Sequence, residues 1–220
     1  MSTVLTIDII SDVVCPWCYV GKRRLERAMA QRPDIQFDVR WLPFFLEART
    51  PPAGMPRTDY ITQKFGTYDK VTPGHARLVP IGAEIGIDFR FERITWQPNT
   101  LDAHRVIHWA QAAGNAGPVV DRLFAMFFTE AANLSDQESL VEASRAGGLD
   151  PDELRRDLSS DRDKELIEKQ VIAAVRAGIG GVPFFVFGKK ISVAGAHEVD
   201  VLVSAVDQAL GPEPAASGAA

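Results

Sequence analysis

The chain has 220 residues, 46% of them hydrophobic, and a formal net charge of −5 at pH 7. The acidic balance argues against nucleic acid or an anionic membrane surface as a main partner, while the hydrophobic content is ample for a buried core. No stretch approaches the length of a transmembrane helix and the N-terminus lacks the features of a secretory signal, so we expect a cytoplasmic protein.

The first part of the sequence predicts a strand, a helix and a second strand. Residues 4–10 form a short β-branched apolar run that is typical of a buried strand. Apolar or small residues then recur at helical spacing over 18–29, with Lys22 and Arg24 among the charged residues of the other face. Over 35–41 apolar and polar residues alternate, which predicts a half-buried strand. A strand–helix–strand unit of this kind implies that the two strands are parallel.

The middle of the sequence predicts mainly helices. Residues 50–56 have the composition of a linker, and helix signals dominate from about 59 to 178. The expected helix starts are Asn99 or Thr100, Pro118, Ser135 with Glu138 in a capping box, Asp150 with Glu153 in a second box, and Ser160 or Asp161.

Strand signals return near the C-terminus. The apolar runs 184–187 and 191–193 flank Gly188-Lys189-Lys190, which is a hairpin pattern. A helix is expected from about 199 to 210, and the small, polar tail 213–220 is expected to be disordered.

Both cysteines of the chain lie in one run, Cys15-Pro16-Trp17-Cys18. Pro16 suits the first helical position, where its missing N–H has no partner to lose, so Cys15 becomes the N-cap. The positive helix end favours the thiolate of Cys15, and Cys18 lies one turn further on the same face. Cys15 is therefore predicted to attack a disulfide and Cys18 to resolve the mixed disulfide. A zinc site would need further ligands in clusters, but the sequence has no second cysteine pair.

The order and spacing of three runs resemble the DsbA family of thioredoxin-fold proteins, and most closely its FrnE-like branch. They are the run from Cys15 to Cys18, Gly181-Val182-Pro183-Phe184, and Asn99-Thr100-Leu101-Asp102-Ala103-His104-Arg105. The resemblance implies an α/β thioredoxin-like fold with a large all-helical insertion. Residues 1–48 and 179–212 would form the thioredoxin-like domain. Residues 49–178 would form the insertion, including the helix that returns to the sheet.

The resemblance also implies roles for individual residues. Pro183 would follow a cis peptide bond and face the dithiol. It would take part in catalysis together with Cys15 and Cys18. Because a proline donates no ladder hydrogen bond, the Val182 backbone would be left free to pair with an extended substrate. Pro16 and Trp17 would contact substrate beside a solvent-facing Cys15.

The implied activity is that of a thiol–disulfide oxidoreductase, a reductase or isomerase acting on protein or small-molecule disulfides. Glutathione or a thioredoxin system would be its redox partner, and no resident cofactor or metal is expected. Asp8 is the better candidate to accept the Cys18 proton, while Asp12 is expected to be a loop or cap residue. His104 and His108, four residues apart on one helix, are expected to be structural or surface residues.

Two other functions are open. The related kappa-class glutathione transferases and 2-hydroxychromene-carboxylate isomerases typically have a serine where Cys15 stands. They also typically have a Ser-Asp pair where this chain has Gly195-Ala196-His197. A non-catalytic peptide-binding or chaperone module is the third possibility, and the presence of both cysteines and the proline argues against it.

Overall fold

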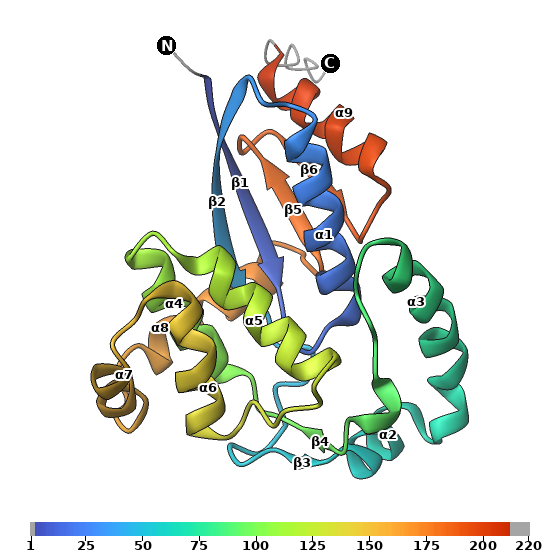
Figure 1. Ribbon diagram of the computed structural model, residues 1–220, viewed down its shortest axis with the longest axis vertical. Coiled ribbons are helices and arrows are strands. Elements are labelled where there is room, and N and C mark those ends of the chain that lie inside the picture. The colour runs from blue at the N-terminus through green and yellow to red at the C-terminus, as the bar shows by residue number, and fades with distance from the viewer. Residues whose placement is uncertain (1–2, 212–220) are drawn as a thin grey trace.

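The computed structural model describes residues 3–211, and a four-stranded mixed sheet forms its centre (Figure 1). The strand order is β2-β1-β5-β6, with β1 at Thr3–Ser11, β2 at Ile35–Pro43, β5 at Phe184–Phe187 and β6 at Ile191–Ala194. The β1 and β2 strands are parallel, as predicted, and both other pairings are antiparallel. The β5–β6 hairpin is also confirmed. The expected tail at 213–220 lies outside the described residues.

Helix α1 (Pro16–Ala30) packs on one face of this sheet, beside α9 (Val199–Leu210). On β1 the residues of that face, such as Ile7 and Ile9, are fully or almost fully buried. The other face is partly open, because Val4 is 57% exposed and Asp8 is only half-buried. The prediction of a buried strand at 4–10 therefore holds fully for one face, whereas on the other face Ile10 alone is buried, at 2% exposed.

The remaining helices belong to the segment between β2 and β5. They are α2 (Arg57–Phe65), α3 (Thr72–Glu84), α4 (Leu101–Ala112), α5 (Ala116–Phe128), α6 (Gln137–Ser144), α7 (Pro151–Leu158) and α8 (Lys164–Arg176). A short antiparallel pair, β3 (Met55–Pro56) with β4 (Trp96–Gln97), ends the expected linker. The helical character of this segment is thus confirmed, whereas the domain boundaries at 48 and 179 stay predictions.

Three predicted helix starts are wrong by a few residues. Helix α5 begins at Ala116, two residues before Pro118, and α8 begins at Lys164 rather than near Asp161. Helix α6 is capped by Asp136, whose carboxylate accepts from the Ser139 N–H at 3.0 Å. The Ser135 hydroxyl accepts instead from the Asn99 N–H at 3.1 Å, so a tertiary contact removes it from the expected capping box.

The cap at Asp150 is as predicted. Its carboxylate accepts from the backbone N–H groups of Asp152 and Glu153, at 3.0 and 2.8 Å. Within the described residues, no helix has the length and apolar character needed to span a bilayer.

Two charged residues of α1 are buried, against the expectation of a solvated face. Lys22 forms ion pairs with Glu26 and, at 2.7 Å, with Asp121 of α5. Arg24 donates to the Ala196 carbonyl at 2.7 Å. The reason is that α5 and the segment after β6 cover α1 on two sides. Each buried cation is matched by an acceptor there, as burial of charge requires.

An aromatic cluster joins α1 to the insertion. The Tyr19 ring stacks on Phe124 with centroids 5.0 Å apart and meets Phe89 edge-on at 6.2 Å. Phe128 lies against both Phe89 and Phe124. These contacts fix the first turns of α1, which carry the cysteines, relative to the helical segment.

Arg105 is a fully buried cation within the helical segment. Its guanidinium donates to the carbonyls of Asp157, Ser160 and Arg162 at 2.6, 2.9 and 2.7 Å, and more weakly to Leu158 at 3.3 Å. Arg105 therefore ties α4 to the end of α7 and to the start of the α7–α8 connection.

Candidate active site

The two cysteines lie at the start of α1, as the sequence predicts. Cys15 is the N-cap, with extended backbone angles (φ −93°, ψ 112°), and Pro16 is the first helical residue. The Cys15 N–H donates to the Asp12 carbonyl at 3.0 Å, and the Cys18 N–H donates to the Cys15 carbonyl at 3.0 Å. Both sulfurs are free thiols in this structure. The loop from Asp12 therefore delivers a dithiol to the first helical turn.

The segment before β5 meets this dithiol from the other end of the sequence. The Val182–Pro183 peptide bond is cis. The Cys15 thiol donates to the Val182 carbonyl with Sγ and O 3.5 Å apart. Pro183 packs against α1 at Gly21, where a Cβ atom would stand 3.0 Å from Pro183 Cγ and 3.0 Å from Phe185 Cζ. The structure thus brings Cys15, Val182 and Pro183 together.

Both thiols are shielded from solvent. Cys15 is 4% exposed and Cys18 is 2% exposed, so the expectation of a solvent-facing Cys15 is wrong in this conformation. Burial raises the pKa of the Cys18 thiol well above its ordinary value of 9.0, and the neighbouring Cys15 sulfur raises it further. Hydrogen bonds from the Ser11 side chain and the Asp12 backbone act in the opposite direction. Cys18 is therefore held as a neutral thiol.

Asp12, and not Asp8, is the carboxylate close to the dithiol loop. Asp8 points to the open face of the sheet, where it accepts from Arg40 Nε at 2.6 Å. Successive side chains of a strand alternate between faces, so the side chain of Asp8 lies on the side of β1 opposite to Ser11 and α1. Asp12 is 1% exposed, and its Oδ2 accepts from the Leu46 N–H at 2.8 Å. The candidate role for Asp8 is not supported by this placement.

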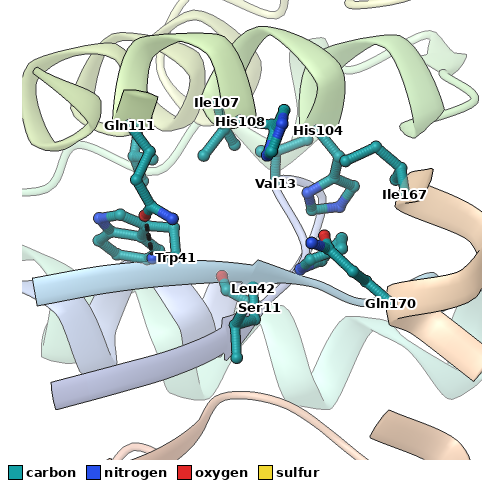
Figure 2. A pocket seen from close by; sticks show the side chains of 12 residues that line it. Ser11, Val13, Trp41, Leu42, His104, Ile107, His108, Gln111, Ile167 and Gln170 are labelled. Atoms are coloured by element: carbon teal, nitrogen blue, oxygen red, sulfur yellow. Dashed lines mark hydrogen bonds between the residues drawn. The ribbon is translucent and has the colours of Figure 1, made fainter. Parts of the chain in front are cut away.

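His104 is buried against the same loop. Its Nε2 lies 3.1 Å from the Phe44 carbonyl and 3.5 Å from Asp12 Oδ1. Figure 2 shows His104 and His108 on the side of α4 that is turned toward β2, with Gln170 of α8 beside them. They line a cavity of about 20 Å³, which has room for one water molecule. In residues 3–211, His, Cys, Asp and Glu side chains do not gather in threes as a metal site requires.

The insertion contributes Tyr60, an aromatic residue expected in its core, and two arginines that the sequence did not single out. The Arg77 guanidinium of α3 lies 5.7 Å from the centre of the Trp17 ring, and that of Arg57 lies 5.1 Å from the ring centre of Tyr60 on α2. Burial raises the pKa of Tyr60 to about 12, and the charges of Arg57, Asp12 and Cys15 all act on it. No motif spacing links these helices to the C-x-x-C run, so only the tertiary structure reveals them.

Comparisons with known proteins agree with this geometry. Residues 6–207 match the profile of the DSBA-like thioredoxin domain. The Bacillus subtilis protein YwbO is 28% identical over 202 residues, which cover 91% of this chain and 94% of YwbO. The structure of the probable DsbA oxidoreductase SCO1869 from Streptomyces coelicolor is 30% identical, with a TM-score of 0.84 over 93% of this chain and 89% of that one.

A more distant structure shares the fold. It is that of the cytosolic disulfide reductase DsbM from Pseudomonas aeruginosa with GSH, which is 17% identical. The two chains superpose with a TM-score of 0.64 over 93% of this chain and 98% of DsbM. The thioredoxin-like fold that the resemblance implied is thereby confirmed.

Proposed function

This chain belongs to the family of DSBA-like thioredoxin domains, and we propose that its Cys15–Cys18 dithiol reduces or isomerises disulfides in proteins or small molecules. The proposal rests on how Cys15, Cys18 and the Val182 carbonyl lie relative to one another. Cys15 is the N-cap residue of α1, Cys18 follows one turn later, and the Val182 carbonyl oxygen lies 3.5 Å from Cys15 Sγ.

The reaction would run through a mixed disulfide. The Cys15 thiolate attacks one sulfur of the substrate disulfide and expels the other as a thiolate. Cys18 then loses its proton and attacks Cys15 Sγ, which releases the second substrate thiol and leaves a Cys15–Cys18 disulfide. The two electrons of the dithiol pass to the substrate. The raised pKa of Cys18 keeps this thiol protonated until the mixed disulfide has formed.

The backbone before β5 would position the substrate. An extended segment laid along Val182 can exchange main-chain hydrogen bonds with it, as in strand addition. The substrate sulfur would then lie next to Cys15 Sγ, which already contacts the Val182 carbonyl. Pro16 and Trp17, both half-buried at the first turn of α1, would form the neighbouring wall.

We place the enzyme in a reducing compartment, with glutathione or a thioredoxin system as reductant. The Cys15 thiol donates its hydrogen bond to a neutral carbonyl rather than pairing with a cation, so its thiolate is less stabilised. A less stabilised thiolate gives a lower reduction potential of the dithiol. We expect a potential of roughly −270 to −180 mV, between thioredoxin-like and isomerase-like values. DsbM, which shares the fold, is a cytosolic disulfide reductase.

Single cysteine variants test the proposal. Cys18→Ser should accumulate mixed disulfides with a protein substrate such as insulin, because nothing releases them, whereas Cys15→Ser should form none. Equal trapping by both variants would reverse or remove the assignment. Equilibration with glutathione gives the potential, and a value near the roughly −120 mV of a strong oxidase would contradict a reducing role.

The same measurements separate the two alternatives. An inert dithiol combined with tight glutathione binding would favour a glutathione-dependent isomerase or transferase. A protein that binds unfolded peptides equally well after both cysteines are replaced would be a non-catalytic chaperone module.

A further inference from the structure

Two arginines of the helical segment, Arg57 and Arg77, lack an acidic partner among the described residues. Arg77 lies over Trp17 within the C-x-x-C run, and Arg57 lies over Tyr60. Across residues 3–211, neither guanidinium has a carboxylate oxygen within 4.0 Å. Both cations are instead held by aromatic faces, which orient a guanidinium but leave its N–H donors largely free.

Arg57 is the more informative of the two, because it is half-buried. It donates to Gln97 Oε1, a neutral acceptor. Burial lowers its pKa, and the titratable groups that act in the opposite direction are the tyrosines Tyr60 and Tyr68, with no carboxylate among them. A half-buried cation without a counter-charge is costly, and a bound anion would offset that cost.

Two carboxylates act on Tyr60, and neither forms an ion pair with Arg57. Glu47 accepts from Arg49 Nε at 2.8 Å and lies 3.9 Å from Lys64 Nζ. Asp12 is bonded to the Leu46 N–H and lies beside His104. Within residues 3–211 Arg57 thus has no carboxylate oxygen within 4.0 Å, although the chain as a whole has 29 acidic and 24 basic residues.

The two cations lie around the dithiol without contacting the reacting sulfur. Arg77 lies over the ring of Trp17, which stands between the two cysteines in the sequence. Tyr60 carries Arg57 over its ring, and the charge of Cys15 acts on the Tyr60 hydroxyl, so this pair belongs to the surroundings of the dithiol. A guanidinium in these surroundings can attract a carboxylate that is a few bonds away from a substrate sulfur at Cys15.

We propose that Arg57 and Arg77 select disulfides that carry carboxylates close to the sulfur atoms. The inference rests on the proposed function, since it assigns a substrate class to the same dithiol. Arginine suits this task because its planar N–H groups match the two oxygens of a carboxylate.

Three small disulfides that differ only in charge test the selection. They are 3,3′-dithiodipropionate with two carboxylates, bis(2-hydroxyethyl) disulfide with none, and cystamine with two ammonium groups. Reduced protein is mixed with each in a single turnover, in which Cys15 and Cys18 become a disulfide and the probe becomes two thiols. Each rate is divided by the rate with dithiothreitol, which removes differences in intrinsic reactivity.

We expect the corrected rates to fall in the order anionic, neutral, cationic, with about a tenfold span that shrinks at about 0.5 M salt. Arg77→Gln and Arg57→Gln should each lower the ratio of anionic to neutral rate about two- to fivefold. Arg156→Gln removes the same charge from an exposed arginine that forms no ion pair within residues 3–211. This arginine belongs to α7, on the opposite side of the molecule from α3 (Figure 1), and its replacement should leave the ratio unchanged.

The outcomes are distinct. Equal corrected rates for the three probes would overturn the selection while leaving the oxidoreductase function intact, whereas no reduction of any probe would remove the function itself. If the preference for the anionic probe survives in both Arg77→Gln, at an exposed side chain, and Arg57→Gln, the assignment of the selection to these two residues would be overturned. Where the small probes show the preference, oxidised peptides with Glu or Lys beside the cysteine identify the source. A larger preference for Glu in the peptides than for the anionic small probe indicates acidic protein segments, and an equal or smaller one indicates small disulfides.

Discussion

Replacing Gly21 by alanine should separate the stability of α1 from the fit between α1 and Pro183. Two opposing effects act at this site. Alanine is favoured over glycine inside a helix by up to about 1 kcal/mol. The new methyl group, however, would stand 3.0 Å from both Pro183 Cγ and Phe185 Cζ, and overpacking of this kind costs about 1–3 kcal/mol. We therefore expect a net destabilisation of about 0–2 kcal/mol.

Gly117→Ala in α5 is the matched control. A Cβ atom at Gly117 meets nothing within 4 Å, so only the helix preference remains, and this variant should gain up to about 1 kcal/mol. Thermal unfolding of the reduced proteins should show midpoints that differ by about 2–12 °C, since 1 kcal/mol shifts a chain of this size by about 2–4 °C.

The functional effect of Gly21→Ala follows from the same contact. To admit the methyl group, Pro183 and the adjoining Val182 carbonyl must shift relative to Cys15, and exchange is sensitive to such misplacement. Single-turnover reduction of bis(2-hydroxyethyl) disulfide should slow about two- to tenfold, while Gly117→Ala keeps the wild-type rate. If Gly21→Ala were as stable as Gly117→Ala and equally fast, the contact between α1 and Pro183 would not be tight, and the reasoning would be refuted.

Three further predictions concern other parts of the chain. Arg105→Met should lower the free energy of unfolding in urea by about 3–5 kcal/mol, because buried carbonyls lose a charged donor. Arg122→Met, at a side chain that is 29% exposed, should lower it by roughly 0–1 kcal/mol. Equal losses for the two variants would contradict the role of burial. Asp150→Ala should cost about 1 kcal/mol and Asp150→Asn much less, since asparagine also caps, and a loss as large for Asn would point to charge instead. Because the pKa of Cys18 is higher in the folded than in the unfolded chain, the folded state holds this proton more tightly. The contribution of this proton to the free energy of unfolding of the reduced protein should thus be fully present below about pH 9 and should be lost as pH rises above it. Cys18→Ala should remove this dependence on pH.

Local patterns were enough to predict most of the fold and the centre of the site. The N-cap at Cys15 depends on Pro16, its immediate neighbour, and the β5–β6 hairpin depends on Gly188 and Lys189, which take positive φ values of 56° and 60°. The cap at Asp150 likewise involves residues within one turn. Such features are set by sterics and hydrogen bonds between near neighbours, which the order of residues specifies directly.

Tertiary structure alone decided which side chains surround the dithiol. The alternation of side chains along a strand shows that Asp8 and Ser11 lie on opposite faces of β1, but it does not show which face α1 covers. The sequence therefore made Asp8 a candidate proton acceptor, whereas in the structure Asp12 is the carboxylate close to the dithiol. Arg57 and Arg77 come to Tyr60 and Trp17 from helices that no sequence spacing relates to the cysteines. Contacts of this kind depend on how the whole helical segment folds back over α1, and burial then sets the charge environment of the site.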